Sequence, residues 1–240
     1  MSNPTAAMVV IGDEILSGRT KDTNVSFLAA ELTQRGIDLR EVRIIPDERE
    51  AIIGTLKVLA TDFDHVFTSG GIGPTHDDIT ADCVAAAFDR PISVRADARL
   101  LLERHYQNSG LELNEARLRM ARIPEAAVLI ANPVSTAPGF SLENVHVMAG
   151  VPAVFKAMVT SLLPTLRCGK PVLQETLRVM RPEGDLAPIL ESLARKYWDL
   201  SIGCYPFQSG KKYGANVVIR GASEDRIKAA LTNLVKEIAS

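Results

Sequence analysis

Short apolar runs alternate with helical repeats over the first two thirds of the chain. Strands are predicted at Met8–Ile11, Ile37–Ile45, His65–Thr68, Val128–Ile130 and Val145–Met148. Helices are predicted at Asp22–Arg35, around Ile52–Leu59, at Asp78–Phe88, Asp97–Gln107 and Asn114–Arg122, and after Pro152. Strands that alternate with helices in this way are typical of an α/β fold with a mainly parallel sheet.

The pattern changes between Leu163 and Pro171, where two prolines and a glycine interrupt it. Beyond this point we expect strands at Pro171–Met180, Leu200–Tyr205 and Asn216–Arg220, with helical stripes at Leu186–Tyr197 and Ile227–Ile238. The sequence therefore predicts two domains: a large α/β domain over residues 1–165 and a small α+β unit, in the order βαββα, over residues 171–240.

Composition and charge exclude several classes of protein. The 240 residues include 27 basic and 29 acidic ones, a net charge of −2, and no basic stripe, so we expect no nucleic-acid partner. No apolar run approaches the roughly 18 residues of a membrane span. The three cysteines, Cys83, Cys168 and Cys204, are too few and too far apart for a disulfide framework or a cysteine-rich zinc site. They suit the reducing cytoplasm, where we expect the protein to be located.

The densest chemical signal is a glycine-rich segment over residues 68–80, Thr-Ser-Gly-Gly-Ile-Gly-Pro-Thr-His-Asp-Asp-Ile-Thr. It begins where a predicted strand ends and leads into a predicted helix, a place where α/β sheets bind ligands and free N–H groups attract phosphates. One alternative is purely structural: Thr75 and Asp78 fit a helix capping box, and glycines can form a tight turn. Capping explains neither the three glycines nor the second carboxylate, Asp77.

The charge of this segment indicates a metal. Residues 68–82 include Asp77, Asp78 and Asp82 but no lysine or arginine. A helix N-terminus supplies only about half a positive charge, which cannot hold a phosphate beside two carboxylates. We therefore expect Asp77 and Asp78 to bind a divalent cation, Mg²⁺, Mn²⁺ or Co²⁺, that bridges them to the phosphate.

Two other predicted strand ends carry acidic residues. Asp13 and Glu14 stand between Gly12 and Gly18 after the first strand, and Asp47 with Glu48 follows the second. Because parallel strands end at the same edge of a sheet, these acids should converge on the glycine-rich segment. For Asp22 and Glu48, a role as acidic residues at a helix N-terminus is an equally good interpretation.

A third loop, residues 132–140, is rich in turn-forming residues. It reads Asn-Pro-Val-Ser-Thr-Ala-Pro-Gly-Phe, and proline alone could stiffen it as a surface loop, or it could contact the ligand. The full set of candidate ligand-binding residues is Gly12, Asp13, Glu14, Ser17, Gly18, Ser69, Gly70, Gly71, Gly73, Pro74, Thr75, Thr80, Asn132, Pro138 and Gly139.

Three of these motifs together resemble a known family. Gly12–Gly18, Thr68–Thr80 and the loop with Asn132, Pro138 and Gly139 are similar, in order and spacing, to the MoaB/Mog-like molybdopterin-binding domain. The resemblance is strongest to the branch found in the competence/damage-inducible protein CinA and in the N-terminal half of eukaryotic FAD synthase. Gly203–Pro206 and Tyr213-Gly214 are similar to the small C-terminal unit of that branch.

The resemblance implies a three-layer α/β/α fold and a ligand that is molybdopterin or an adenylylated pterin. In the CinA-like branch it also implies metal-dependent hydrolysis of a pyrophosphate such as ADP-ribose or FAD. The acids that matter for this chemistry in the family fall on Asp47 and Asp78, which we take as the catalytic residues. Family members are often oligomers, so a dimer or trimer is expected.

Three departures affect these expectations: Ser135 stands where the family usually has glycine, Ala149 where it often has proline, and Cys204 where serine is usual. The first two lie outside the glycine-rich segment but put the identity of the ligand in question. Three functions therefore stay open: a metal-dependent pyrophosphatase, molybdopterin binding or pterin adenylyl transfer without hydrolysis, and a non-catalytic assembly domain. The C-terminal unit favours the first, because pterin-only relatives usually end near residue 165.

Overall fold

The apolar runs of the N-terminal part form a six-stranded sheet in the computed structural model of the protein, which describes residues 3–210 and 212–239. Its strands are β1 (Thr5–Ile11), β2 (Asp38–Ile45), β3 (His65–Ser69), β6 (Val128–Ile130), β7 (Gly139–Leu142) and β8 (Val145–Met148). They lie in the order β2-β1-β3-β8-β7-β6, and β1 pairs in parallel with β2 and β3, as β3 does with β8. Strand β7 runs antiparallel to both of its neighbours, β6 and β8.

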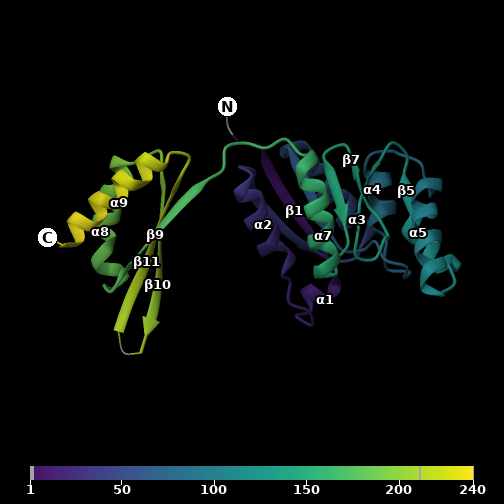
Figure 1. The fold of residues 1–240 in the computed structure, drawn as a ribbon, viewed down its shortest axis with the longest axis horizontal. Coiled ribbons are helices and arrows are strands. Elements are labelled where there is room, and N and C mark those ends of the chain that lie inside the picture. The colour runs from purple at the N-terminus through teal and green to yellow at the C-terminus, as the bar shows by residue number, and fades with distance from the viewer. Residues whose placement is uncertain (1–2, 211, 240) are drawn as a thin grey trace. The chain divides into compact units, whose positions relative to one another are not determined.

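Helices cover both faces of this sheet, because β1 is apolar on both sides. Ala7, Val9 and Ile11 pack into a core with α3 (Arg49–Asp62), α4 (Thr80–Ala87) and α5 (Ala96–Ser109). The alternate residues Ala6, Met8 and Val10 pack into a second core with α2 (Asn24–Gln34) and α7 (Pro152–Leu162). Figure 1 shows the sheet between these two sets of helices. The expected three-layer, mostly parallel α/β/α fold is confirmed.

The predicted helix over Asn114–Arg122 is present, but only as one α-helical turn followed by a 3₁₀ turn. The Asn114 side chain accepts a hydrogen bond from Arg117 N at 3.0 Å and begins a single turn, α6 (Glu115–Leu118), followed by the 3₁₀ turn η1 (Arg119–Ala121). The chain then becomes β5 (Arg122–Pro124), which pairs antiparallel with β4 (Ile92–Val94). A residue before proline is disfavoured in helices, and Ile123, which precedes Pro124, is extended and buried.

Two further boundaries differ from the sequence prediction. The third loop ends earlier than expected, because Gly139 and Phe140 belong to β7. A Cβ on Gly139 would lie 2.4 Å from the carbonyl oxygen of Val147, so only glycine allows β7 to pack this closely on β8. Helix α4 begins at Thr80, which leaves Asp78 in the turn that precedes it. The short helix α1 (Asp13–Leu16) and the 3₁₀ turn η2 (Leu163–Thr165) complete this part of the chain.

The second unit has a core of its own, and the chain divides into Met1–Gly169 and Lys170–Ser240. Its elements are β9 (Leu173–Val179), α8 (Glu183–Lys196), β10 (Ser201–Ser209), β11 (Lys212–Gly221) and α9 (Glu224–Ala239). The strands form an antiparallel sheet in the order β10-β11-β9, and Leu193, Val217 and Leu234 are among the residues buried between it and the helices. None of the helices in the described ranges is long and apolar enough to cross a membrane.

Candidate functional site

A cavity of about 360 Å³ lies where the parallel strands end, next to the glycine-rich segment. Four acidic residues line it: Glu14, Asp47, Asp77 and Asp78. The backbone of Gly70, Gly71, Gly73 and Gly150 forms another part of the wall, and Met120, Val154 and Met158 form an apolar part. The structure thus brings together acids from three different strand ends, as the parallel arrangement predicts.

Two glycines make the close packing of this wall possible. Gly70 has a φ of +111°, and a Cβ there would lie 2.2 Å from the carbonyl oxygen of Ile11. Gly71 has a φ of +67°, and its Cβ would lie 2.1 Å from the Thr80 hydroxyl, which donates to the carbonyl of Gly70 at 3.1 Å. No other residue type fits either position without displacing backbone or a buried side chain.

The glycine-rich segment also presents unused hydrogen-bond donors. Gly70 N donates to Met148 O at 3.1 Å and Thr80 N donates to Gly71 O at 3.0 Å, which fixes the segment at both ends. Between these points, the N–H groups of Gly71, Ile72 and Gly73 donate no backbone hydrogen bond within the described part of the chain. Since these residues line the cavity, their N–H groups are suited to bind an anion.

Asp78 closes a turn rather than capping a helix. Its carboxylate accepts hydrogen bonds from the backbone N–H of Thr75, at 2.8 Å, and from the Thr75 hydroxyl. The first of these is one of the two contacts of a capping box, but the helix begins only at Thr80, after Ile79, so both bonds stabilise an isolated turn. The capping interpretation therefore accounts for the local bonds and does not explain why the carboxylate lies on the cavity.

The acidic residues perturb one another. Burial raises the pKa of Asp47, and the charges of Asp13, Glu14 and Asp77 raise it further, although the N–H of Asp13 donates to Asp47 Oδ2 at 3.0 Å and acts in the opposite direction. Asp77 is fully exposed, and hydrogen bonding from Thr75 lowers its pKa. No lysine or arginine is among the described residues that line this cavity, so its wall concentrates negative charge.

This donor set fits a hard divalent cation. Carboxylate oxygens are the preferred ligands of Mg²⁺ and Mn²⁺, and a cation would relieve the repulsion that raises the Asp47 pKa. In residues 3–210 and 212–239, no three histidine, cysteine or acidic side chains are grouped closely enough to hold a metal by themselves. A cation at Asp77 and Asp78 would therefore take its remaining ligands from water or from the phosphate oxygens of a ligand.

Asn24 is a site residue that the sequence prediction missed. Its side-chain Nδ2 donates to Ser69 Oγ at 2.9 Å and to Gly150 O at 2.8 Å, so it joins the start of α2 to the end of β3 and to the loop after β8, both beside the cavity. Asn24 is only 2% exposed, on the face of α2 that also buries Leu28 and Leu32. A polar residue at helical spacing from two apolar ones was the signal that could have revealed it.

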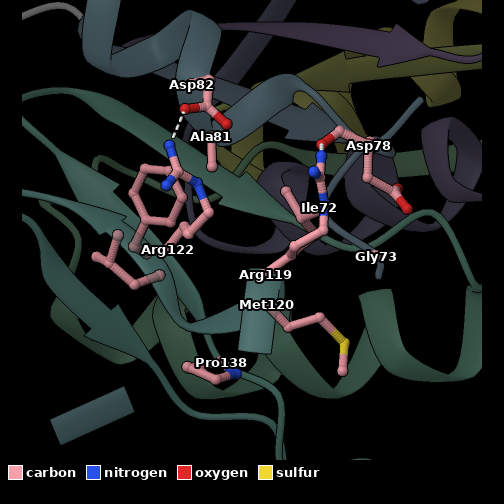
Figure 2. Close-up of a pocket in the computed structure, with 12 residues that line it drawn as sticks. Ile72, Gly73, Asp78, Ala81, Asp82, Arg119, Met120, Arg122 and Pro138 are labelled. Atoms are coloured by element: carbon pink, nitrogen blue, oxygen red, sulfur yellow. Dashed lines mark hydrogen bonds and ion pairs between the residues drawn. The ribbon is translucent and has the colours of Figure 1, made fainter. Parts of the chain in front are cut away.

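Two arginines from the segment after α6 also reach the glycine-rich segment. Figure 2 shows Arg119 directed toward Asp78 and Arg122 directed toward Asp82, with which it forms an ion pair at 2.5 Å. Both line a small cavity that Gly71, Gly73 and Asp78 also line. Residues 68–82 contain no lysine or arginine, but in the folded protein a segment distant in sequence supplies two arginines beside them. No local spacing in the sequence could have shown this.

Most of the other predicted ligand-binding residues lie around the cavity without lining it. Asn132 lines it, but its side chain mainly closes its own loop, accepting from Val134 N and Ser135 N and donating to Ala137 O. Pro138 lines only the small cavity. The candidates that line neither cavity are Gly12, Asp13, Ser17, Gly18, Ser69, Pro74, Thr75, Thr80 and Gly139. Asp22 accepts from Val25 N at 2.9 Å, as a residue at a helix N-terminus does.

Comparisons with known proteins agree with this division of the chain. A family described as probable molybdopterin binding domain matches residues 7–168, and the middle domain of FAD synthase matches residues 171–240. A protein from Metallosphaera sedula is 32% identical over 98% of this chain and 92% of its own length. A protein from Pyrococcus furiosus is 34% identical over 94% of each chain.

A solved structure is similar to the first unit. It is the crystal structure of the protein CinA, with unknown function, from Thermoplasma acidophilum. The two chains are 32% identical with a TM-score of 0.62, over 68% of this chain and 97% of that one.

Proposed function

This chain belongs to the molybdopterin-binding domain family, and we propose that within it the protein is a metal-dependent pyrophosphatase that cleaves a dinucleotide such as ADP-ribose or FAD. The observation that carries the proposal is the composition of the cavity. Four carboxylates and three backbone N–H groups that donate no backbone hydrogen bond line the same space of about 360 Å³. Phosphate oxygens can accept hydrogen bonds from these N–H groups. A divalent cation between the phosphate and the carboxylates would offset the repulsion between their negative charges.

Each residue has a role in this proposal. The N–H groups of Gly71, Ile72 and Gly73 bind phosphoryl oxygens and stabilise the negative charge that grows on them during attack. Asp77 and Asp78 hold the divalent cation. When bound, such a cation neutralises phosphate charge and lowers the pKa of coordinated water. Asp47, whose pKa is raised, accepts a hydrogen bond from the attacking water and orients it.

The second unit supports the choice of a dinucleotide. Its match to the middle domain of FAD synthase places a flavin dinucleotide among the first substrates to test. The resemblance of the first unit to the CinA-like branch, which hydrolyses pyrophosphates, points to the same class of bond. The expected divalent metal, dinucleotide ligand and homo-oligomeric state all belong to this proposal.

A second function, molybdopterin binding or pterin adenylyl transfer without hydrolysis, is favoured by the apolar part of the cavity wall. Met120, Val154 and Met158 offer a surface on which a flat pterin ring could pack, while its phosphate occupies the glycine-rich segment. Binding of molybdopterin by a protein that cleaves no pyrophosphate would support this function over the first.

The test is release of product from ADP-ribose, FAD and NAD in the presence of Mg²⁺, Mn²⁺, Co²⁺ or a chelator. Asp78→Asn should lower the rate by about 100-fold or more, because it removes a negative ligand of the cation. Asp89→Asn is the matched control, since Asp89 is an exposed aspartate outside both cavities. A metal-independent rate, or an unchanged rate in a folded Asp78→Asn variant, would contradict the proposal.

A further inference from the structure

Among the described residues, Arg119 has no counterion, and it lies beside the glycine-rich segment that lines the acidic cavity. The segment after Asn114 carries three arginines, and two of them are engaged elsewhere. Arg122 forms an ion pair with Asp82, and Arg117 lies over the Tyr106 ring, 4.9 Å from its centroid, and donates to a backbone carbonyl. Within the described residues, no carboxylate lies within ion-pair distance of Arg119.

The donors of Arg119 are also poorly used. Its Nε–H is buried and has no hydrogen-bond partner among residues 3–210 and 212–239. In the described part of the chain, the guanidinium makes one hydrogen bond, and it is a long one, from Nη2 to the carbonyl oxygen of Asp78 at 3.4 Å. A buried, unsatisfied N–H costs free energy, and a charged one costs more, so most such groups in proteins meet a partner. An anion is the natural partner of a guanidinium group.

The position of Arg119 indicates where such an anion would bind. It lines a small cavity of about 20 Å³, enough for one water-sized group, which shares Gly71, Ile72, Gly73 and Asp78 with the large acidic cavity. In Figure 2 its guanidinium end lies beside Asp78, next to the glycine-rich segment. A ligand bound over Gly71 and Gly73 would therefore lie next to the small cavity that Arg119 lines.

We propose that Arg119 binds the second phosphate group of a diphosphate ligand and so makes the site selective for diphosphates over monophosphates. The inference rests on one part of the proposed function, the binding of a phosphate at the glycine-rich segment. The acids and their cation would hold one phosphate, and Arg119 would hold the neighbouring one. A forked guanidinium suits this task because it offers two parallel N–H donors to phosphate oxygens.

The experiment compares ADP with AMP, which differ by one phosphate, as probes of binding in the presence of Mg²⁺. Isothermal titration calorimetry of Arg119→Met should show ADP binding about 10- to 100-fold weaker and AMP binding changed less than about twofold. Arg119→Lys should lose an intermediate amount, since it keeps the charge and lacks the fork. Arg117→Met is the matched control, because it removes an arginine of the same segment that lines neither cavity.

Equal losses for ADP and AMP, or no loss for either, in a variant with a wild-type circular dichroism spectrum would overturn the inference. If Arg119→Met does not fold, the ratio of ADP to AMP affinity in Arg119→Lys decides instead.

Measurements of dinucleotide cleavage distinguish a failure of this inference from a failure of the proposed function. A wild-type protein that cleaves no dinucleotide but still requires Arg119 for ADP binding contradicts only the pyrophosphatase. A protein that cleaves dinucleotides with the same kcat/KM in Arg119→Met contradicts only the role of Arg119.

Discussion

Asn24 is the residue on which the shape of the cavity depends most directly. It donates from one amide nitrogen to Ser69 Oγ, at the end of β3, and to Gly150 O, in the loop that follows β8. The two segments also meet backbone to backbone, since a Cβ on Gly150 would lie 3.3 Å from the Gly70 Cα. Asn24 therefore acts as a positioning residue: it touches no part of the cavity itself but holds two segments that line it.

Asn24→Ala should destabilise the protein by about 1–3 kcal/mol, the cost of leaving buried hydrogen-bonding groups unpaired. Urea unfolding measures this loss. The same variant should raise KM for the dinucleotide, or weaken ADP binding, because the glycine-rich segment loses its support.

Asn144→Ala is the matched control for Asn24→Ala. Asn144 Nδ2 also donates to two backbone carbonyls, Ala60 O at 2.9 Å and Phe63 O at 2.8 Å, but it does not line the acidic cavity. We expect a comparable loss of stability with ligand binding intact. If the two variants impair binding equally, Asn24 contributes only to stability.

At the scale of secondary structure, two neighbouring strands are joined by histidines. His146 of β8 lies between Ser141 of β7, whose hydroxyl is 2.9 Å from Nδ1, and His65 of β3, whose Nδ1 is 3.2 Å from Nε2. Burial, and then the nearby His65, lower the pKa of His146 to about 3. Burial also lowers the pKa of His65. Both imidazoles are therefore neutral near pH 7, which allows them to share one hydrogen bond.

This pair predicts loss of stability in mild acid. In the unfolded chain His146 takes up a proton near its ordinary pKa of 6.5, whereas in the folded chain it does so only near 3. Its contribution to stability is therefore full above pH 6.5 and is lost as the pH falls from 6.5 toward 3, by up to about 1.4 kcal/mol per pH unit. Urea unfolding at pH 7 and pH 5 measures the slope.

His146→Gln should be less stable at pH 7 and should show a flatter dependence on pH. His76→Gln serves as the control for the removal of an exposed histidine. A His146→Gln variant with the wild-type slope between pH 7 and pH 5 would mean that other groups cause the acid sensitivity.

Local pattern predicted most of the elements and part of the site. Strands β1, β3, β6 and β8 are short apolar runs, and the glycine-rich segment is a local motif. Such features can be recognised in the sequence without knowing which residues pack against them. By contrast, β5 and β7 are extended because of their partners: Ile123 pairs with Ser93 and Phe140 with Val147. Arg119 reaches the site only because that strand pairing turns its segment toward Asp78. Such features depend on contacts between distant segments, which periodicity does not record.

At the scale of the whole molecule, the hydrophobic cores belong to separate parts of the chain. The two cores of the first unit lie within residues 6–166, and the core of the second unit lies within residues 177–238. The cavity and all four of its acids belong to the first unit. Each unit therefore buries its own apolar surface, which is the property that lets a domain fold by itself.

A chain that stops after Gly169 should accordingly fold and unfold at about the same temperature as the first unit does in the full protein. Thermal unfolding followed by circular dichroism, with calorimetry of the full chain, tests this expectation. The shortened chain should also keep the binding of ADP with Mg²⁺. Aggregation, or a much lower unfolding temperature, would show that the second unit stabilises the first.

The pairing of β3 with β8 has a consequence for the order in which the molecule folds. Strands β1, β2 and β3 are close in sequence and can associate early, but Val66 of β3 pairs with Val145 of β8, after three α-helices, one 3₁₀ turn and four strands have intervened. Contacts between such distant segments carry a large loop-closure entropy and form slowly. Because Gly70 N bonds to Met148 O and Gly150 packs on Gly70, the cavity is completed only by this late step. Ligand-binding competence should therefore be among the last properties that a refolding chain acquires.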